Sequence, residues 1–335
     1  MINRIQPKLL FISLLVLLIL AFASSLSIGA VPIPFNQLPN ALLNSHSQEG
    51  LIIWQIRIPR ALLGCIAGAV LAICGVAMQG LFRNPLADPG LIGVSSGASL
   101  GAGVAIVFSG HLTFFPIIAP YLLSISAFVG GLVVTWLVYQ LGQRQGTTDV
   151  ATMLLAGIAI TALAGACIGL LMHIADDTML RKLTFWNMGS LNGAMYSNLW
   201  PLLIVTVAIF IFLPLRANGL NALLLGESEA RHLGIQVERL KIELIVCTAL
   251  GTGAAVAATG LIGFVGLVVP HLIRLLIGPN HRFLLPASAI AGACLLVLSD
   301  ILARVVFAPA ELQIGIVTAF LGAPFFLYLL VRRRY

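Results

Sequence analysis

The amino-acid sequence predicts an all-α integral membrane protein that crosses the bilayer with ten helices. Hydrophobic residues make up 60% of the 335 residues, and charged residues make up only 9%. A soluble domain carries roughly a quarter charged residues, so this chain has too little charge for a surface that faces water. Charge-poor runs recur along the whole sequence, most of them near the roughly 20 residues that span a bilayer.

The ten runs are candidates for membrane-spanning helices. They cover residues 9–30, 59–81, 91–108, 116–140, 150–172, 197–215, 241–260, 262–276, 284–303 and 313–331. The first run follows Arg4 and Lys8 as a signal peptide would, but its apolar stretch exceeds the about 7–15 residues of such a peptide, so we expect a span. The eighth run is short, and Gly260 and Gly263 separate it from the seventh. Its backbone must therefore be buried in protein or line a cavity.

The distribution of Lys and Arg predicts the orientation, because cytoplasmic loops carry an excess of both. With ten spans and a cytoplasmic N-terminus, 13 of the 18 Lys and Arg residues lie inside. The five outside are Arg57, Arg60, Arg181, Lys182 and Arg304. We therefore expect both termini in the cytoplasm. No linker interrupts the pattern, so residues 1–335 are expected to form one transmembrane domain.

Several other functions lack sequence support. The five cysteines lie in apolar runs without a C-x-x-C pair, so neither a metal site nor a disulfide is predicted. The basic residues are scattered, which does not indicate nucleic-acid binding. No phosphate-binding G-x-x-x-x-G-K-[ST] loop is present, and no catalytic residues are predicted. Glycines four residues apart indicate close helix packing. They are Gly93, Gly97 and Gly101, then Gly64 and Gly68, then Gly165 and Gly169.

Short motifs along the whole chain carry a family resemblance. They are Arg57-Ile-Pro-Arg60, Gly68-Ala-Val-Leu-Ala72, Gln79, Arg83-Asn-Pro-Leu-Ala-Asp-Pro89, residues 225–234, residues 263–271, Asp300-Ile-Leu-Ala-Arg304 and Gly322-Ala-Pro-Phe325. In this order they resemble the ten-span permeases of type II ABC importers for haem, ferric siderophores and vitamin B12. The resemblance implies a permease that pairs with a second copy, two separate ATPase subunits that use the ATP, and a periplasmic substrate-binding protein.

The resemblance assigns residues 217–240 to coupling with the ATPase. The residues implied are Gly226, Glu227, Glu229, Ala230, Arg231, Leu233 and Gly234. A short helix with charges of both signs can pass rigid-body motion between subunits without crossing the bilayer. A solvated connecting loop is the alternative.

The resemblance also implies that Arg57, Arg60 and Arg304 receive glutamates of the binding protein. Complementary charges fix the register of such a contact and speed the encounter. Alternatively, these arginines anchor helix ends at the lipid headgroups, or Arg304 pairs with Asp300 one turn away.

The outer segment 175–190 bears on the cargo, because it resembles the haem branch of the family, as does segment 88–98. Met179 and Trp186 are candidates to meet a porphyrin ring, Arg181 its carboxylates, and His173 its iron. The alternative is an interfacial helix with an ordinary aromatic belt.

The sequence therefore predicts the permease subunit of a haem importer in a bacterial inner membrane, with no permanently bound cofactor. A ferric-siderophore or vitamin B12 permease is the alternative within the family. A secondary transporter driven by an ion gradient is the alternative of another class. Ionisable residues in the middle of the spans are nearly absent, which argues against it.

Overall fold

The computed structural model describes residues 5–29, 31–108, 119–144 and 146–332, and long helices dominate it. The long helices are α1 (Pro7–Ser27), α4 (Ile58–Leu81), α5 (Val94–Phe108), α6 (Leu122–Leu141), α7 (Val150–Ile174), α9 (Tyr196–Leu215), α12 (Val237–Thr259), α13 (Val265–Ile277), α14 (His281–Val305) and α15 (Ile314–Arg332). The short ones are α2 (Leu38–Leu43), α3 (Gln48–Ile52), α8 (Asp177–Asn187), α10 (Ala217–Leu223) and α11 (Glu227–His232). The described residues also contain a π-helical turn η1 (Ile53–Arg57) and two 3-10 turns, η2 (Pro89–Ile92) and η4 (Ala119–Tyr121). The strands β1 (Gln143–Arg144) and β2 (Thr147–Thr148) pair antiparallel.

Each of the ten predicted spans corresponds to one long helix. Seven helical segments in the described residues are long and apolar enough to cross a membrane, and α5, α13 and the apolar part of α15 are shorter. Residues 116–118 of the fourth predicted span lie outside the described part of the chain. The separation of α12 from α13 at Gly260 is confirmed, and a Cβ added at Gly260 would overlap the carbonyl oxygen of Trp186. The non-helical backbone is therefore packed in protein at this point, as expected.

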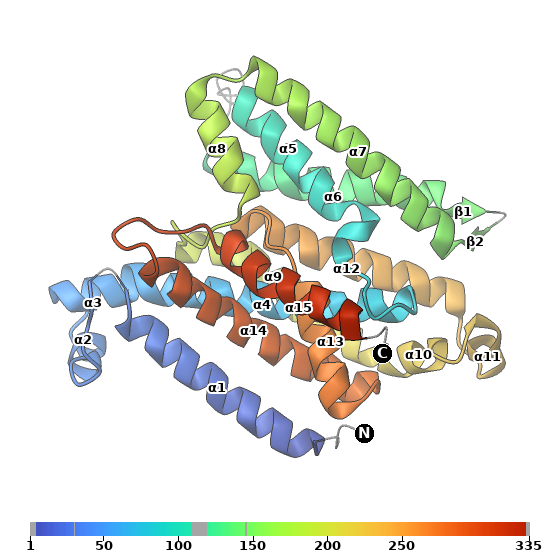
Figure 1. Ribbon diagram of the computed structural model, residues 1–335, viewed down its shortest axis with the longest axis horizontal. Helices are drawn as coiled ribbons and strands as arrows, with labels where there is room; N and C mark the ends of the chain where they lie inside the picture. The colour runs from blue at the N-terminus through green and yellow to red at the C-terminus, as the bar shows by residue number, and fades with distance from the viewer. Residues whose placement is uncertain (1–4, 30, 109–118, 145, 333–335) are drawn as a thin grey trace.

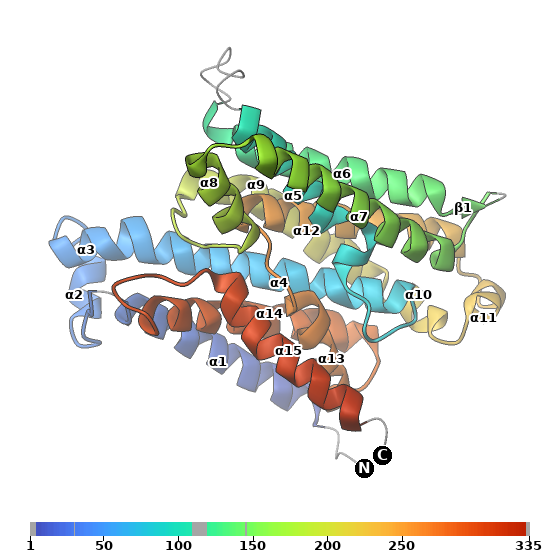
Figure 2. The ribbon, with the colours of Figure 1, turned by 45° about the horizontal axis from the view of Figure 1, so that its top comes forward.

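Helix α4 runs through the middle of the bundle (Figures 1 and 2). On one side α12 packs against it, with α5, α6 and α7 beyond; on the other side α14 packs against it, with α1 and α13 alongside. Helices α2 and α3 lie at one end of the bundle, which we name the α3 end; α11 lies at the opposite, α11 end (Figure 2). The start of α1 and the end of α15 both lie toward the α11 end (Figure 1), as an even number of spans requires.

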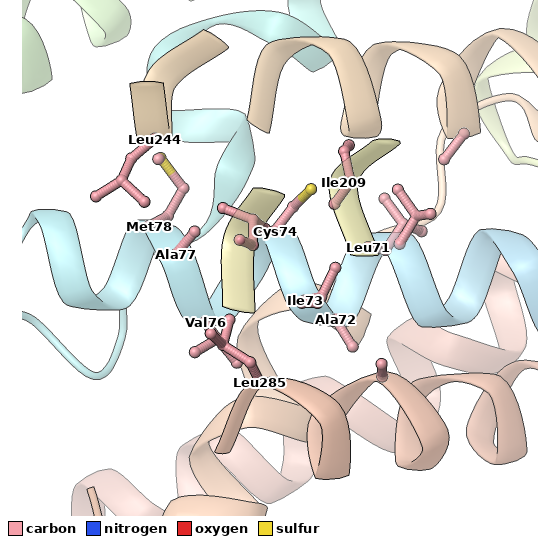
Figure 3. Packing of buried hydrophobic residues seen from close by; sticks show 14 of the residues in the cluster. Leu71, Ala72, Ile73, Cys74, Val76, Ala77, Met78, Ile209, Leu244 and Leu285 are labelled. Atoms are coloured by element: carbon pink, nitrogen blue, oxygen red, sulfur yellow. The ribbon is translucent and has the colours of Figure 1, made fainter. Parts of the chain in front are cut away.

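The core surrounds α4 (Figure 3). Ile73, Cys74 and Met78 of α4 are fully buried, and Ile209 of α9 and Leu244 of α12 belong to the same cluster. All five cysteines are free, and the two on α4 and α14 that are classed as buried, Cys74 and Cys294, confirm that this residue type fills packing space here.

Glycine allows the central helices to approach at backbone distance. A Cβ added at Gly68 would overlap the carbonyl oxygen of Gly292 on α14. At Gly97 and Gly101 of α5 it would overlap backbone oxygens of α6. Close packing of these glycines is confirmed. For Gly165 and Gly169 close packing stays a prediction, because no described atom lies within 4 Å of a Cβ added at either.

Candidate functional sites at the two ends of the bundle

Three arginines from distant parts of the sequence meet at the α3 end. Arg57 is the last residue of the π-helical turn η1, Arg60 lies in the first turn of α4, and Arg304 lies in the last turn of α14. The exposed fractions are 4%, 6% and 5%, respectively. These residues therefore lie just beneath the surface of the isolated chain rather than projecting from it.

One carboxylate, Asp300, joins two of the arginines. Its Oδ2 lies 3.1 Å from Nε of Arg304, which is the predicted pair one helical turn apart. Its Oδ1 lies 2.9 Å from Nε of Arg60 on α4. Asp300 is itself 2% exposed. An ion pair this deeply buried is stable only when each charge keeps its partners, so Asp300 holds α4 and α14 together at this end.

The other arginine contacts are to backbone carbonyl groups. Arg57 donates to the carbonyl oxygens of Leu26 and Val31, and Arg304 Nη1 donates to that of Ile28 at 3.1 Å. Among the described residues, Arg57 has no carboxylate partner. These contacts bring the C-terminal end of α1 and the chain after it against α4 and α14.

Glu311, which the sequence reasoning missed, completes this arginine cluster. Its Oε2 lies 3.0 Å from Nη1 of Arg60, and its side chain is 33% exposed. It lies between α14 and α15, where the next residue, Leu312, donates its N–H to the carbonyl oxygen of Ala303 at 3.0 Å. The cluster thus has three cations and two anions, and Glu311 is its most exposed charge. Only its position as the single acid between the last two spans distinguished it in the sequence.

Helix α8 also lies at the α3 end, and it contains three of the four candidate cargo contacts. Asp176 caps its N-terminus by accepting a hydrogen bond from the Met179 N–H at 2.8 Å. Arg181 is exposed, Met179 is half-buried, and Trp186 is half-buried against a cluster that includes Ala98 of α5. The fourth candidate, His173, is exposed near the end of α7. Arg181 and His173 are therefore the two candidate cargo contacts whose side chains are exposed.

The chain around α8 connects to α15. The N–H groups of Ile314 and Gly315 donate to the carbonyl oxygens of Gly189 and Met188, at 3.1 and 3.0 Å. Two backbone hydrogen bonds therefore join the start of α15 to the chain that follows α8, and Glu311 lies three residues before that junction.

At the α11 end, the predicted coupling segment 217–240 contains two short helices, α10 and α11. Gly226 and Gly234 flank α11 with φ of +120° and +82°, a region that glycine adopts without strain. Ala230 is fully buried beneath the helix, whereas Leu233 is 62% exposed. Glu229 and His232 are also exposed. Helix α11 therefore has an exposed surface that points away from the bundle and carries both charged and apolar side chains.

Lys241, a buried cation, holds α11 against the bundle. Its Nζ lies 2.8 Å from Oε2 of Glu227 and 3.2 Å from Oε1 of Glu238, and it donates to the Thr148 carbonyl oxygen at 2.9 Å. Arg231 adds a pair to Glu227 at 3.4 Å. The sequence reasoning placed Lys241 at a cytoplasmic helix end and assigned it no role.

A cavity of about 750 Å³ lies beside this network. Its charged lining is Arg83, Arg144, Arg231, Lys241, Asp149, Glu227 and Glu238. Hydrogen bonds from the Thr152 hydroxyl and the Ala151 N–H hold the pKa of Asp149 below its ordinary value. In the described residues, no group of three or more His, Cys, Asp and Glu side chains is placed to hold a metal ion.

Comparison with known proteins gives one family and close relatives of known type. The model of the FecCD transport family matches residues 17–332. The hemin transport system permease protein HmuU of Yersinia pestis is 46% identical over 333 residues, which cover 99% of this chain and 98% of that protein. The vitamin B12 import system permease protein BtuC of Vibrio cholerae serotype O1 is 42% identical over 287 residues, 85% of this chain and 84% of that protein.

A solved structure has the same architecture. It is an inward-facing metal-chelate type ABC transporter, 34% identical in sequence, with a TM-score of 0.85. The match covers 98% of this chain and 100% of the solved one.

Proposed function

The chain belongs to the FecCD transport family and is the membrane-spanning permease of an ABC importer, and from this premise we propose that its cargo is haem. The sequence prediction of a ten-helix permease fold is confirmed by the family match and by the solved transporter. The observation that carries the haem proposal is the 46% identity to a hemin permease over 99% of the chain.

Vitamin B12 is the second candidate cargo. The vitamin B12 permease of Vibrio cholerae is 42% identical, over a smaller 85% of the chain. Haem is favoured by the longer alignment and by the chemistry of α8, because exposed Arg181 and Lys182 are suited to the two propionates of the porphyrin.

Cargo-stimulated ATP hydrolysis tests the proposal. The chain is reconstituted in proteoliposomes with its ATPase and its binding protein, and haem, a ferric siderophore and vitamin B12 are offered separately. Stimulation by haem alone is expected. Stimulation by another compound would retain the importer and overturn haem as its cargo.

We propose that the α11 end faces the cytoplasm of a bacterial inner membrane, with both termini there, and docks two ATPase subunits in the assembled importer. The exposed face of α11 supports this, since Leu233 is 62% exposed beside exposed Glu229 and His232. Glu227 joins this face to α12 through an ion pair with the buried Lys241. Motion of an ATPase subunit bound to α11 would therefore be transmitted directly to the spanning helix α12. The residues proposed for coupling are Gly226, Glu227, Glu229, Ala230, Arg231, Leu233 and Gly234, within 217–240.

We propose that the α3 end docks a periplasmic substrate-binding protein at the cluster of Arg57, Arg60 and Arg304. The cluster has one more cation than anions, and Arg57 has no carboxylate partner among the described residues. The three arginines are only 4–6% exposed, so an acidic side chain from a partner reaches them only if the chain around them rearranges. We place the contact with the partner's acidic side chain at Glu311, because Arg60 already binds this partly exposed carboxylate.

The proposed cargo contacts are His173, Met179, Arg181 and Trp186. Trp186 packs in the cluster with Ala98, so we propose that it lines the translocation pathway. Arg181 and His173 have exposed side chains, and we propose that they contact the cargo directly. We further propose that a second copy of the chain completes the path. Helix α7 supports this, because no described atom lies within 4 Å of a Cβ added at Gly165 or Gly169.

A further inference from the structure

Two cavities adjoin where α9 and α12 reach the α11 end. The first, of about 420 Å³, is an apolar groove between the two helices, lined by residues that include Ile204, Ala208 and Phe212. The second, of about 400 Å³, is polar, and its walls include Asn218, Gln236 and Arg239. Arg216 and Glu243 line both cavities, so the apolar groove runs directly into the polar pocket.

The groove faces outward from the bundle. Ile204 is 69% exposed, Phe212 55% and Val246 49%. All three lie on spanning helices, where the surrounding medium is lipid. An acyl chain therefore fits the groove by chemistry and by position.

The junction of the two cavities carries excess positive charge. Arg216 binds Glu243 with two hydrogen-bonding nitrogens, Nε at 2.6 Å and Nη2 at 3.0 Å. Arg239 binds the same carboxylate through Nε at 3.0 Å, and its side chain is 70% exposed. Its two terminal nitrogens donate no hydrogen bond within the described part of the chain. Two cations share one anion, so one positive charge remains for a ligand.

We propose that this paired groove and pocket bind one anionic phospholipid, with an acyl chain between α9 and α12 and the phosphate on Arg239 and Arg216. An apolar slot that ends in uncompensated arginine nitrogens is complementary to a molecule with an apolar tail and a negative head. The α11 end is the proposed cytoplasmic end, where anionic lipid is attracted to basic residues next to spanning helices.

The bound lipid also touches the coupling segment. Gly234, Ile235 and Gln236, which connect α11 to α12, line the polar pocket. A phosphate on Arg239 therefore steadies the link between the ATPase-facing helix and the spanning helix. Anionic lipid is expected to increase transport per ATP hydrolysed, whereas zwitterionic lipid leaves it low.

Native mass spectrometry of the full-length chain with its ATPase subunits tests the site. Palmitoyl-oleoyl phosphatidylglycerol is the probe, phosphatidylethanolamine is the zwitterionic comparison, and glycerol 3-phosphate is the headgroup without a tail. Wild type is expected to retain phosphatidylglycerol in preference to the other two. Arg239→Gln should weaken retention about fivefold, the typical effect of one basic residue at a membrane surface.

Matched variants separate the site from general surface effects. Arg144→Gln removes an exposed arginine at the same end that does not line either cavity. Ala208→Trp fills the groove, whereas Val207→Trp adds the same bulk one residue away, at a position outside its lining. Arg239→Gln and Ala208→Trp should lose phosphatidylglycerol, and the two controls should keep it.

Three outcomes would overturn the proposal. They are equal retention of phosphatidylglycerol and phosphatidylethanolamine, equal losses in Arg239→Gln and Arg144→Gln, and a photo-crosslinker at Ala208 that joins two copies of the chain instead of a lipid. The last would assign the groove to the contact between copies. None depends on the cargo, so each stands apart from the haem test.

Discussion

Asp300 is the residue on which the arginine cluster depends. It is 2% exposed and it binds Arg60 and Arg304 at 2.9 and 3.1 Å. Asp300→Asn leaves two buried guanidinium groups without their shared anion, and removing one partner of a buried pair costs about 3–5 kcal/mol. We expect a lower melting temperature for the purified variant in detergent. Asp177→Asn, on the exposed first turn of α8, is the control and should melt like wild type. Equal melting of both variants would show that Asp300 contributes little.

Glu311 competes, in this view, with an acidic partner for Arg60. Glu311→Gln removes the half-exposed carboxylate at 3.0 Å from Arg60 and leaves the cluster with one more unbalanced positive charge. We expect the binding protein to associate about fivefold more tightly at low salt, because one charge pair at this depth contributes about 1 kcal/mol. The gain should shrink at high salt. Binding is measured with the permease in nanodiscs.

Glu49→Gln provides the comparison for Glu311, because Glu49 is an exposed acid of α3 at the same end. If Glu49→Gln strengthens binding as much, the effect is one of overall charge and Glu311 has no specific role. Weaker binding of Glu311→Gln would mean that Glu311 orders the docking surface.

Sequence reasoning at the scale of single residues succeeded where partners are close in the chain. The pair of Asp300 with Arg304 follows from helical spacing and is confirmed. The pair of Asp300 with Arg60 joins residues 240 positions apart, and no local pattern predicts it. The burial of Lys241 was missed for the same reason, since its partner Glu227 lies on another helix.

At the scale of elements, α11 depends on the glycines at its two ends. Gly234 has φ of +82°, and no described atom lies within 4 Å of a Cβ added there. Gly234→Val therefore creates backbone strain of about 1–2 kcal/mol without a steric clash. We expect the strain to be relieved by a shift of α11, which lowers transport per ATP hydrolysed in proteoliposomes.

Gly193 is a matched control for Gly234. It has φ of +74° and equal free space, but it lies in the loop between α8 and α9. Gly193→Val should carry the same strain and keep ATP hydrolysis coupled to transport. Loss of coupling in both variants would attribute the effect to strain in general, and normal coupling in Gly234→Val would remove α11 from the proposed mechanism.

Element boundaries were predictable where hydrophobicity sets them. Runs of apolar residues located the ten long helices, and Gly260 located the break between α12 and α13. The π-helical turn before α4 was not predicted. It turns the Arg57 side chain toward the α1–α2 connection, and that contact exists only in the folded bundle.

At the scale of the whole molecule, the composition predicted the membrane, and the glycine spacing predicted close helix packing at Gly68, Gly97 and Gly101 without naming the partner helices. Gly165 and Gly169 have the same spacing but pack against no described atom of this chain. A small-residue pair records close packing against some partner, but it does not say whether that partner belongs to the same chain. Helix α7 lies at the edge of this chain (Figure 1), which is the position expected of a helix that meets a second copy.

The central position of α4 leads to a prediction about the entire bundle. A Cβ added at Gly75 of α4 would overlap the carbonyl oxygen of Gly266 on α13. Gly75→Ala therefore forces two backbones apart at the centre of the core, and overpacking of this kind costs about 1–3 kcal/mol or more. Gly165→Ala makes the same chemical change on a spanning helix where no described atom lies within 4 Å. Within a single chain this change should be neutral or stabilising by about 0.5–1 kcal/mol, because alanine favours the helix. Any cost of the added methyl group would therefore arise at the proposed contact with the second copy. Melting of the two purified variants, followed by tryptophan fluorescence, should therefore shift in opposite directions or by very different amounts. A lower melting temperature for Gly165→Ala alone would mean that the contacts with the second copy, rather than those around α4, limit the stability of the permease.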